Sequence, residues 1–357
     1  MRKIYLIRHG LPHFPGGGPY CLGKADFPLD PLGRLQACQM GQGLKGEKLT
    51  VFTSPLKRAY DTAAYINPSP SVIGDLQEMH AGEWDGLSFR EIKEKWPELY
   101  EARATDTLLP IPGAENWDKG QARFIKAVEA ALSRSEGDIA IVAHTTVILS
   151  FICHIMESTE YKEFRYRQSY GGYYLVTLDD EGVYHCEFPW RRPVPELDGE
   201  LCRRLMAAAE APEHIRAHCE AVASKAMELW EALSEAGLRL SKEAIYHGAL
   251  LHDIARLHPD HAARGAGWLE ELGYGAVADI IRRHHDPEGT ELDEAALLYM
   301  ADKLVQETRT VTLRERFENS LAKCRDAEAQ AAHKRRREQA QAMADRINRM
   351  CGRELII

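Results

Sequence analysis

The pattern of apolar residues changes completely at about residue 190 of this 357-residue chain. Before that point, short apolar runs such as "KIYLI", "LTVFTS", "DIAIVAH" and "GGYYLVTLD" alternate with amphipathic segments such as "SFREIKEKWPELYEAR". After it, only helical patterns follow one another. Strands that alternate with helices favour a mainly parallel sheet covered by helices. The sequence therefore predicts an α/β domain followed by a separate all-α domain.

The boundary between these two parts lies in the segment "FPWRRPVPELDGE", which contains three prolines and is crossed by no periodic pattern. A chain of this length is long for a single hydrophobic core. We therefore predict an α/β domain over residues 1–191, a linker over 192–205 and a helical domain over 206–357.

Charge and composition narrow the classes of partner. A formal net charge of -9 argues against nucleic acid as the main partner. The longest apolar stretch is interrupted by His144 and His154, so we interpret it as a strand, a turn and a helix rather than a membrane span. Eight cysteines without a C-x-x-C pair are typical of reduced thiols in a cytoplasmic protein. We expect small-molecule partners, with neither membrane nor nucleic acid, and leave a homodimer open.

Polar side chains stand where predicted elements of the first domain end. The strand "KIYLI" leads into Arg8 and His9, and the strand in "IVAHTT" ends on His144. Arg58 lies at a strand-to-helix turn, and Glu78 lies in a loop rich in glycine and aromatic residues. In open α/β sheets, ligands bind at the carboxyl edge of the strands. We therefore expect these side chains to form one site.

Several segments in a fixed order carry a family resemblance: "LIRHG", "DFPLDPLGRLQA", "SPLKRAYDTA", "EMHAGEWDGLS", "PGAEN" and "AH". Together they resemble the histidine phosphatase superfamily over about residues 1–190, which implies a three-layer, phosphoglycerate mutase-like α/β fold. The resemblance implies that His9 is the nucleophile of a metal-free reaction and that Arg8 and Arg58 bind the phosphate. By the same resemblance, His144 donates a hydrogen bond to the transferring phosphoryl group, and Glu78 is the general acid.

The residue types suit this chemistry. Guanidinium groups match phosphate oxygens, a neutral imidazole nitrogen is a nucleophile, and a carboxylic acid can protonate a leaving alkoxide. Glu83 and Asp85 lie close to Glu78 in the sequence and remain alternatives for the acid. The segment "GEWDG" resembles the branch of broad-specificity and α-ribazole-5′-phosphate phosphatases, and Ala81 stands where mutases usually carry tyrosine. We therefore favour a phosphatase and keep a mutase as the alternative.

Histidines are concentrated in the second domain, where eight of the fifteen fall between residues 214 and 285. The segment "LLHDIAR" places His252 and Asp253 side by side, and His218 shares a helical stripe with the apolar Val222 and Leu229. Buried imidazoles and carboxylates are costly unless they are paired or bind a metal. The pattern therefore indicates a metal site between helices.

His218 followed by "HDIAR", "HAARGAGWL", "IIRRHHD" and "YMADKL" resembles the HD-domain phosphohydrolases over about residues 210–305. The resemblance implies one or two divalent ions such as Fe, Mn, Co or Ni, with Arg256 and Lys303 available for phosphate oxygens. By the same resemblance, the core metal ligands are His218, His252, Asp253 and Asp302. The ligands of a second ion are His261, His284 and His285.

Taken together, the two resemblances predict a bifunctional phosphate-ester hydrolase. The first domain would be a phosphomonoesterase, and the second a metal-dependent phosphohydrolase acting on a nucleotide-like or cofactor-derived substrate. In the alternative, the HD domain is a ligand sensor or a scaffold attached to the phosphatase.

Overall fold

The structure is a computed structural model, and it describes residues 1–357 with the exception of 107–108, 159–167, 286–290 and 323. It divides into two compact units, Met1–Pro195 and Glu196–Ile357. The described elements of the first unit are β1 (Arg2–Arg8), η1 (Pro15–Gly17), α1 (Pro31–Gly43), β2 (Thr50–Thr53), α2 (Lys57–Ala64), β3 (Ser71–Val72), η2 (Gly74–Leu76), η3 (Gly82–Trp84), α3 (Phe89–Lys95), α4 (Pro97–Thr105), α5 (Trp117–Ser133), β4 (Ile139–Ala143), α6 (Thr145–Ile155), β5 (Tyr173–Leu178) and β6 (Tyr184–Arg191).

The first unit is built on a six-stranded sheet with the order β3-β2-β4-β1-β5-β6. The strands β1 to β4 run parallel, β5 is antiparallel to β1, and β6 is antiparallel to β5. This confirms the predicted α/β class. The edge strand β6 extends into the segment that the sequence predicts as the boundary between the two domains. The prolines of that segment do not prevent this, because one side of an edge strand makes no ladder hydrogen bonds, so a missing N–H on that side removes none.

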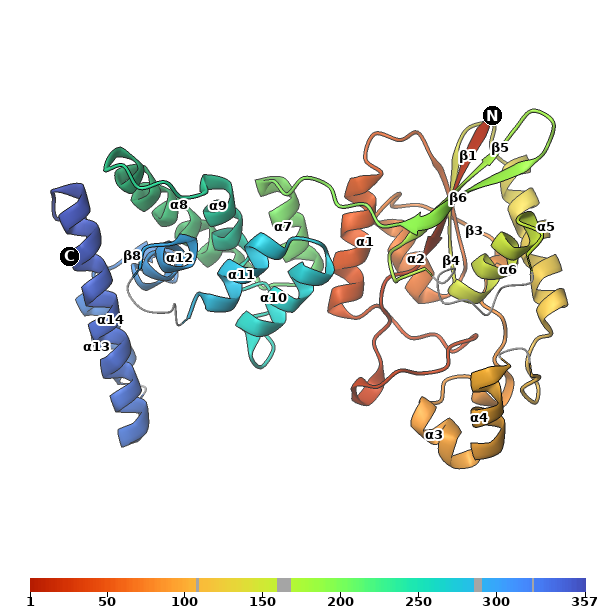
Figure 1. Cartoon of the computed structure of the whole chain (residues 1–357), viewed down its shortest axis with the longest axis horizontal. Helices are drawn as coiled ribbons and strands as arrows, with labels where there is room; N and C mark the ends of the chain where they lie inside the picture. Colours follow the sequence, from red (N-terminus) through yellow and green to blue (C-terminus); the bar gives the residue numbers. More distant parts are fainter. Residues whose placement is uncertain (107–108, 159–167, 286–290, 323) are drawn as a thin grey trace. The chain divides into compact units, whose positions relative to one another are not determined.

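Helices cover both faces of this sheet, as Figure 1 shows. Alternate residues of β1 point to opposite faces, so Ile4 and Leu6 pack in one core cluster with Phe124 of α5. Tyr5 and Ile7 pack in a second cluster with residues of α1 and α2. The strand β1 is therefore buried on both faces, and the residues that follow it are fixed in position.

One predicted helix is divided in two. The segment "SFREIKEKWPELYEAR" forms α3 and α4, with Trp96 between them. Pro97 is the first residue of α4, where its missing N–H costs nothing, whereas inside a continuous helix it would remove a hydrogen bond.

The second unit is mostly helical, as the sequence pattern predicts. Its described elements are α7 (Gly199–Ala208), α8 (Glu213–Glu235), α9 (Lys242–Leu251), α10 (His261–Glu271), α11 (Gly275–Arg283), α12 (Glu294–Lys303), β7 (Val305–Gln306), β8 (Arg309–Thr310), α13 (Leu313–Leu321) and α14 (Ala327–Cys351). The helix α7 begins within the interval 192–205 that the sequence assigns to a linker, and it buries Leu201 and Leu205.

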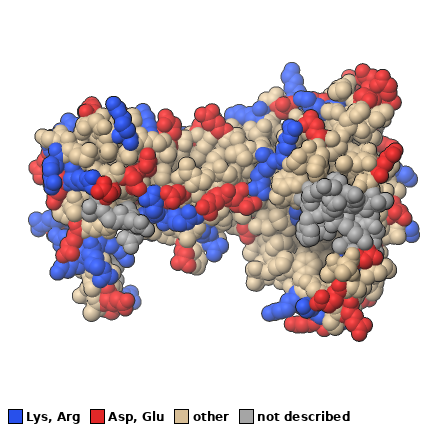
Figure 2. Space-filling model, viewed as in Figure 1, with Lys and Arg blue, Asp and Glu red and all other residues tan. Residues whose placement is uncertain are grey.

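The outer surface carries both signs of charge. On the face in Figure 2, acidic and basic side chains are interspersed over each unit. A basic run, Lys334–Arg337, is exposed on α14. Within the described part of the chain, no helix has both the length and the apolar character needed to cross a membrane.

Candidate active site and metal centre

His9 and His144 meet because they follow neighbouring parallel strands. Arg8, the last residue of β1, is paired with Ala143, the last residue of β4, so the next residue of each strand lies at the same edge. The two imidazole rings have their centroids 5.1 Å apart, and both side chains are buried. The expectation that these histidines gather at the carboxyl edge of the sheet therefore agrees with the geometry.

The imidazole of His9 is held in one tautomer. Its Nδ1 lies 2.7 Å from the carbonyl oxygen of Gly10, which can only accept, so Nδ1 carries the proton and Nε2 keeps its lone pair. Burial, together with the positive charges of Arg58 and Arg8, holds the pKa of His9 well below its usual range. The ring is therefore neutral near pH 7, with Nε2 available as a nucleophile.

Arg58 is fully buried beside this nitrogen. Its Nε donates to Nε2 of His9 at 3.3 Å, and its two terminal nitrogens donate to the carbonyl oxygens of Ala25, at 2.7 Å, and Gly23, at 2.9 Å. Burial lowers the pKa of Arg58, but a guanidinium remains charged in proteins. These bonds use three of its five N–H groups, so two are available to an anion placed against His9.

Arg8 brings a second guanidinium to the same site. It lies over the ring of Tyr170, 3.7 Å from the centroid, and donates to the carbonyl oxygen of Gln168 at 2.6 Å. The ring of Tyr170 also lies 5.7 Å from that of His9, measured between centroids. Tyr170 and Gln168 are site residues that the sequence analysis missed.

His144 is oriented by Ser54, another residue that the sequence analysis missed. Its Nε2 lies 2.8 Å from Oγ of Ser54, which follows β2 at the same edge of the sheet. Its Nδ1 is buried, with no hydrogen-bond partner among the described residues. Burial and the nearby cation of Arg58 hold the pKa of His144 well below its usual range. One ring nitrogen is therefore left for a ligand.

Glu78 lies against the N-terminus of α6. Its carboxylate accepts hydrogen bonds from the backbone N–H groups of Met79, Thr146 and Val147 at 2.9, 3.0 and 3.1 Å. Burial raises the pKa of the carboxyl group, although the bonds from Thr146 and Met79 oppose this shift. A raised pKa favours a carboxyl that can hold and release a proton during a reaction.

The two alternatives for the acid are placed differently. The side chain of Glu83 is exposed. The carboxylate of Asp85 accepts hydrogen bonds from the backbone N–H groups of Gly23, Lys24 and Ala25, each through at least one oxygen at 2.8 to 3.1 Å. Asp85 is therefore engaged in holding the loop that carries the carbonyl acceptors of Arg58, whereas Glu78 is bonded to backbone groups just after His144.

In the second unit, all seven residues predicted as metal ligands come together from five helices or their ends. His218 belongs to α8 and Asp302 to α12, and the pair His252–Asp253 directly follows α9. His261 begins α10, and His284 and His285 directly follow α11. Their ligand atoms form three overlapping groups, each within 4.8 Å: His218, His252 and Asp302; His252, Asp253 and His284; His261, His284 and His285.

Three of these histidines are oriented in the same way. The Nδ1 atoms of His218, His252 and His284 lie 2.8, 2.8 and 2.6 Å from backbone carbonyl oxygens. Each Nδ1 must therefore carry a proton. This leaves Nε2 of His252 and of His284 with a lone pair at the cluster, whereas Nε2 of His218 lies 3.2 Å from Oδ1 of Asp302. Metal-binding histidines usually donate a hydrogen bond from their other ring nitrogen in this manner.

Buried polar atoms without partners indicate that the cluster fits a cation. Among the residues that the structure describes, Nε2 of His252 and Nε2 of His284 have no hydrogen-bond partner. Burial opposes ionisation of Asp302, yet Lys303 and His218 hold its pKa well below the usual range. Lone pairs and ionised carboxylates in one buried cluster are a suitable ligand set for a divalent metal.

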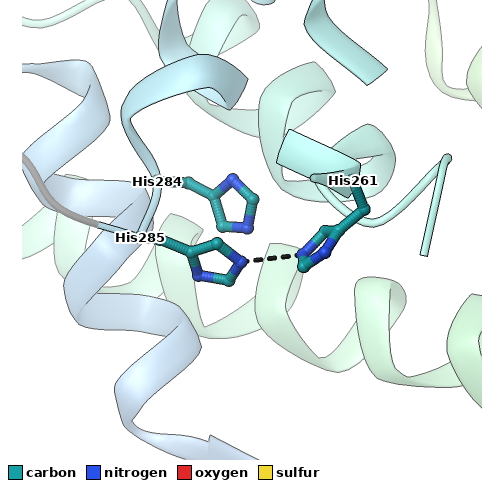
Figure 3. A group of neighbouring side chains, drawn as sticks. All are labelled: His261, His284 and His285. Atoms are coloured by element: carbon teal, nitrogen blue, oxygen red, sulfur yellow. Dashed lines mark hydrogen bonds between the residues drawn. The ribbon is translucent and has the colours of Figure 1, made fainter. Parts of the chain in front are cut away.

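The third group lies at the open side of the cluster and is drawn in Figure 3. His261, from the start of α10, points toward His284 and His285 from the end of α11, and its Nε2 lies 2.7 Å from Nε2 of His285. Burial lowers the pKa of His285 to about 4, so this ring is neutral near pH 7. Nε2 of His261 also lies 3.2 Å from Oδ1 of Asp253, which connects this group to the others.

Comparison with known families finds both of the families that the sequence resembles. The family model of the histidine phosphatase superfamily (branch 1) matches residues 4–187, more than half of the chain. The chain therefore belongs to the histidine phosphatase superfamily and is a phosphoric ester hydrolase. The model of the HD domain matches residues 215–307 of the same chain, so the two predicted families are both confirmed.

Named relatives resemble part of the chain. The metal-independent phosphoserine phosphatase of Arabidopsis thaliana is 32% identical over 167 residues, which are 44% of this chain and 70% of the relative. The bifunctional protein Rv2228c of Mycobacterium tuberculosis is 31% identical over 153 residues, which are 41% of this chain and only 42% of that relative. Among solved structures, the α-ribazole phosphatase of Shigella flexneri is 24% identical with a TM-score of 0.47, and covers 55% of this chain and 100% of its own.

Proposed function

We propose that the domain over residues 1–191 hydrolyses phosphate monoesters through a phosphohistidine at His9. The observation that carries this proposal is the fixed tautomer of His9, whose unprotonated Nε2 lies 3.3 Å from Nε of Arg58. A relative named as a metal-independent phosphatase supports a reaction without a metal ion in this domain.

In the first step, Nε2 of His9 forms a bond to phosphorus while the bond from phosphorus to the ester oxygen breaks. Arg8, Arg58 and His144 stabilise the negative charge on the phosphoryl oxygens. Glu78 gives its proton to the leaving alkoxide. In the second step, Glu78 takes a proton from water as the water oxygen attacks phosphorus, and the bond to His9 breaks to release phosphate.

The test of this proposal uses the whole chain. The substitution His9→Ala should abolish hydrolysis of an aryl phosphate, and chelators should not affect the wild-type rate. A quench of the wild type in alkaline detergent should trap a phosphoenzyme that is stable to base and labile to acid. His13→Ala is a matched control, because this nearby histidine has a side chain that is 57% exposed. Full activity in the His9→Ala variant would contradict the proposal.

A mutase activity remains the alternative for the same site. A mutase returns the phosphoryl group to a second hydroxyl of the substrate, whereas a phosphatase transfers it to water. Release of inorganic phosphate without a phosphorylated donor would support the phosphatase, and a strict requirement for such a donor would favour the mutase.

We further propose that the domain over residues 206–357 is a metal-dependent phosphohydrolase. The core ligand set would be His218, His252, Asp253 and Asp302, and the set for a second ion His261, His284 and His285. The support is the shared orientation of three histidines, whose Nδ1 atoms are bonded to carbonyl oxygens. Divalent ions of Fe, Mn, Co or Ni, when bound, lower the pKa of water and polarise a phosphate.

The chain's own residues would supply the orientation of the substrate in this second site. Lys303 and Arg256 lie against the carboxylates of the cluster, at 2.8 Å from Asp302 and 3.6 Å from Asp253. Cations in these positions can bind phosphate oxygens. The alternative is that this domain is a sensor or a scaffold, in which the same metal ligands are present but no substrate is hydrolysed.

Elemental analysis of the full chain, purified without a chelator, tests the metal proposal. We expect one or two transition-metal ions per chain, lost in His252→Ala and in Asp253→Ala. His214→Ala, at an exposed position on α8, is the matched control and should keep the metal. Absence of metal under every loading condition would contradict the proposal. Metal without any phosphohydrolase activity in the His9→Ala background would favour the sensor.

A further inference from the structure

Arg316 reaches the His/Asp cluster from outside the matched HD region. The HD match ends at residue 307, whereas Arg316 belongs to α13. This helix begins with a capping box between Thr312 and Glu315, which fixes its start. Nη2 of Arg316 lies 3.9 Å from Oδ2 of Asp302. The helix α13 therefore adds to the cluster a cation that the HD motifs do not include.

Arg316 is one of three cations around the two carboxylates. Nζ of Lys303 lies 2.8 Å from the same oxygen of Asp302, and Nη1 of Arg256 lies 3.6 Å from Oδ1 of Asp253. These cations come from α12, from α13 and from the segment after α9. The carboxylates are thus outnumbered before any metal ion is counted, and the site favours a ligand with several negative charges.

Arg316 is not needed to pair the carboxylate that it faces. Lys303 already makes a hydrogen bond to Oδ2 of Asp302, and Nε2 of His218 lies 3.2 Å from Oδ1. At 3.9 Å, Nη2 of Arg316 is beyond hydrogen-bond distance from the carboxylate. Its side chain is 29% exposed, and its fork of N–H groups matches the geometry of a phosphate.

We propose that Arg316 and Lys303 form a subsite for a second phosphate group, so that the HD site takes substrates with two or more linked phosphates rather than monoesters. This inference rests on the proposed hydrolase function of the same site. One phosphate would lie at the His/Asp groups, and its neighbour would lie against the two cations beside Asp302. In the reaction, a water oxygen bonds to one phosphorus, the bridging P–O bond breaks, and the two phosphate products share the protons of the water.

The test measures binding as well as turnover, in the full chain with His9→Ala to remove the first activity. The probes are methylenediphosphonate, which has two linked phosphorus groups that cannot be hydrolysed, and methylphosphonate, which has one. Calorimetry with equal Mn²⁺ in cell and syringe compares Arg316→Gln with Arg314→Gln. Arg314 is the matched control, because it lies on the same helix with a side chain that is 79% exposed.

We expect Arg316→Gln to weaken methylenediphosphonate binding about tenfold or more, since a charge-assisted contact is lost, and to change methylphosphonate binding less than about twofold. Arg314→Gln should change neither. In turnover assays, Arg316→Gln should raise KM for a nucleoside diphosphate. An unchanged melting temperature and metal content would show that the variant is folded.

The outcomes separate this inference from the hydrolase function on which it rests. If Arg316→Gln weakens the binding of both probes equally, or of neither, the diphosphate subsite is overturned. Metal-dependent hydrolysis of a monoester that is insensitive to Arg316→Gln would also overturn it, while leaving the hydrolase function intact. If the diphosphonate preference depends on Arg316 but no phosphate compound is hydrolysed, the subsite is supported and the hydrolase function fails.

Discussion

The carboxylate of Asp85 connects two loops of the phosphatase site, and replacing it with asparagine tests how the phosphate-binding Arg58 is positioned. Asp85 accepts hydrogen bonds from the N–H groups of Gly23, Lys24 and Ala25. The carbonyl oxygens of Gly23 and Ala25 in turn accept from Arg58. An asparagine keeps one acceptor oxygen but turns an N–H₂ group toward a backbone N–H, so at least one of these bonds is lost.

The size of the effect follows from that bond. A hydrogen bond to a charged group contributes about 1.5–3 kcal/mol, and the side chain of Asp85 is only 13% exposed, so solvent screens it little. If this whole free energy is lost from the stabilisation of the transition state by Arg58, kcat/KM falls by roughly 10- to 160-fold. We expect the fall for Asp85→Asn within this range.

The assay compares leaving groups, because Asp85 is also an alternative for the general acid. A positioning residue should affect p-nitrophenyl phosphate and phenyl phosphate equally, whereas loss of a general acid harms the poorer leaving group more. We therefore expect equal falls for Asp85→Asn and a larger fall on phenyl phosphate for Glu78→Gln. Glu83→Gln, at an exposed neighbouring position, is the control and should keep full activity.

Two results would refute this reasoning. A selective loss on phenyl phosphate in Asp85→Asn would make Asp85 the acid and leave Glu78 as a structural carboxylate. An unchanged kcat/KM with both substrates would mean that Arg58 does not depend on the loop from Gly23 to Ala25. Melting temperatures of the variants separate either result from general unfolding.

Three further predictions concern the same site. Because burial lowers the pKa of His9, the ring stays neutral as pH falls through 6.5; kcat/KM, corrected for substrate ionisation, should therefore stay level there, and a fall centred on pH 6.5 would contradict this. Gly33→Ala should lower the free energy of unfolding by about 1–3 kcal/mol in chemical denaturation and should also lower phosphatase activity, because the added Cβ would lie 2.0 Å from the carbonyl oxygen of Leu11. A free energy of unfolding equal to that of the wild type would show that the loop after His9 moves to accept the methyl group. Ser54→Ala should reduce kcat about tenfold with little change in KM, because His144 loses the hydroxyl that orients it; an unaltered kcat would show that other contacts orient the ring.

The sequence was sufficient to predict the residues that follow parallel strands. Arg8, His9 and His144 stand directly after apolar runs, and the pairing of β1 with β4 brings them together. The same rule applied to β2 would have indicated Ser54, but a serine after a strand is too common to be informative by itself. In the second unit, the density of histidines was the signal, and the structure brings all seven predicted ligands into overlapping groups.

Other site residues could not be predicted, because the pattern does not reveal the direction of a strand. Tyr170 precedes β5, and only because β5 is antiparallel to β1 does its beginning lie at the edge where the parallel strands end. Arg316 likewise belongs to a helix whose charged pattern is that of a solvated surface. Its place beside Asp302 is set by the packing of α13 after the strand pair β7–β8, which the charge pattern does not reveal.

The pairing of β1 with β4 also has a consequence for the order in which the phosphatase site is assembled. These two strands are neighbours in the sheet, yet β2, β3 and five α-helices lie between them in the described part of the chain. No local folding event can therefore bring His9 to His144, and contacts between distant segments form slowly because a long loop must first close. During refolding, phosphatase activity should appear only when β4 inserts between β1 and β2, so that recovery of activity reports completion of the sheet and not the earlier formation of its helices.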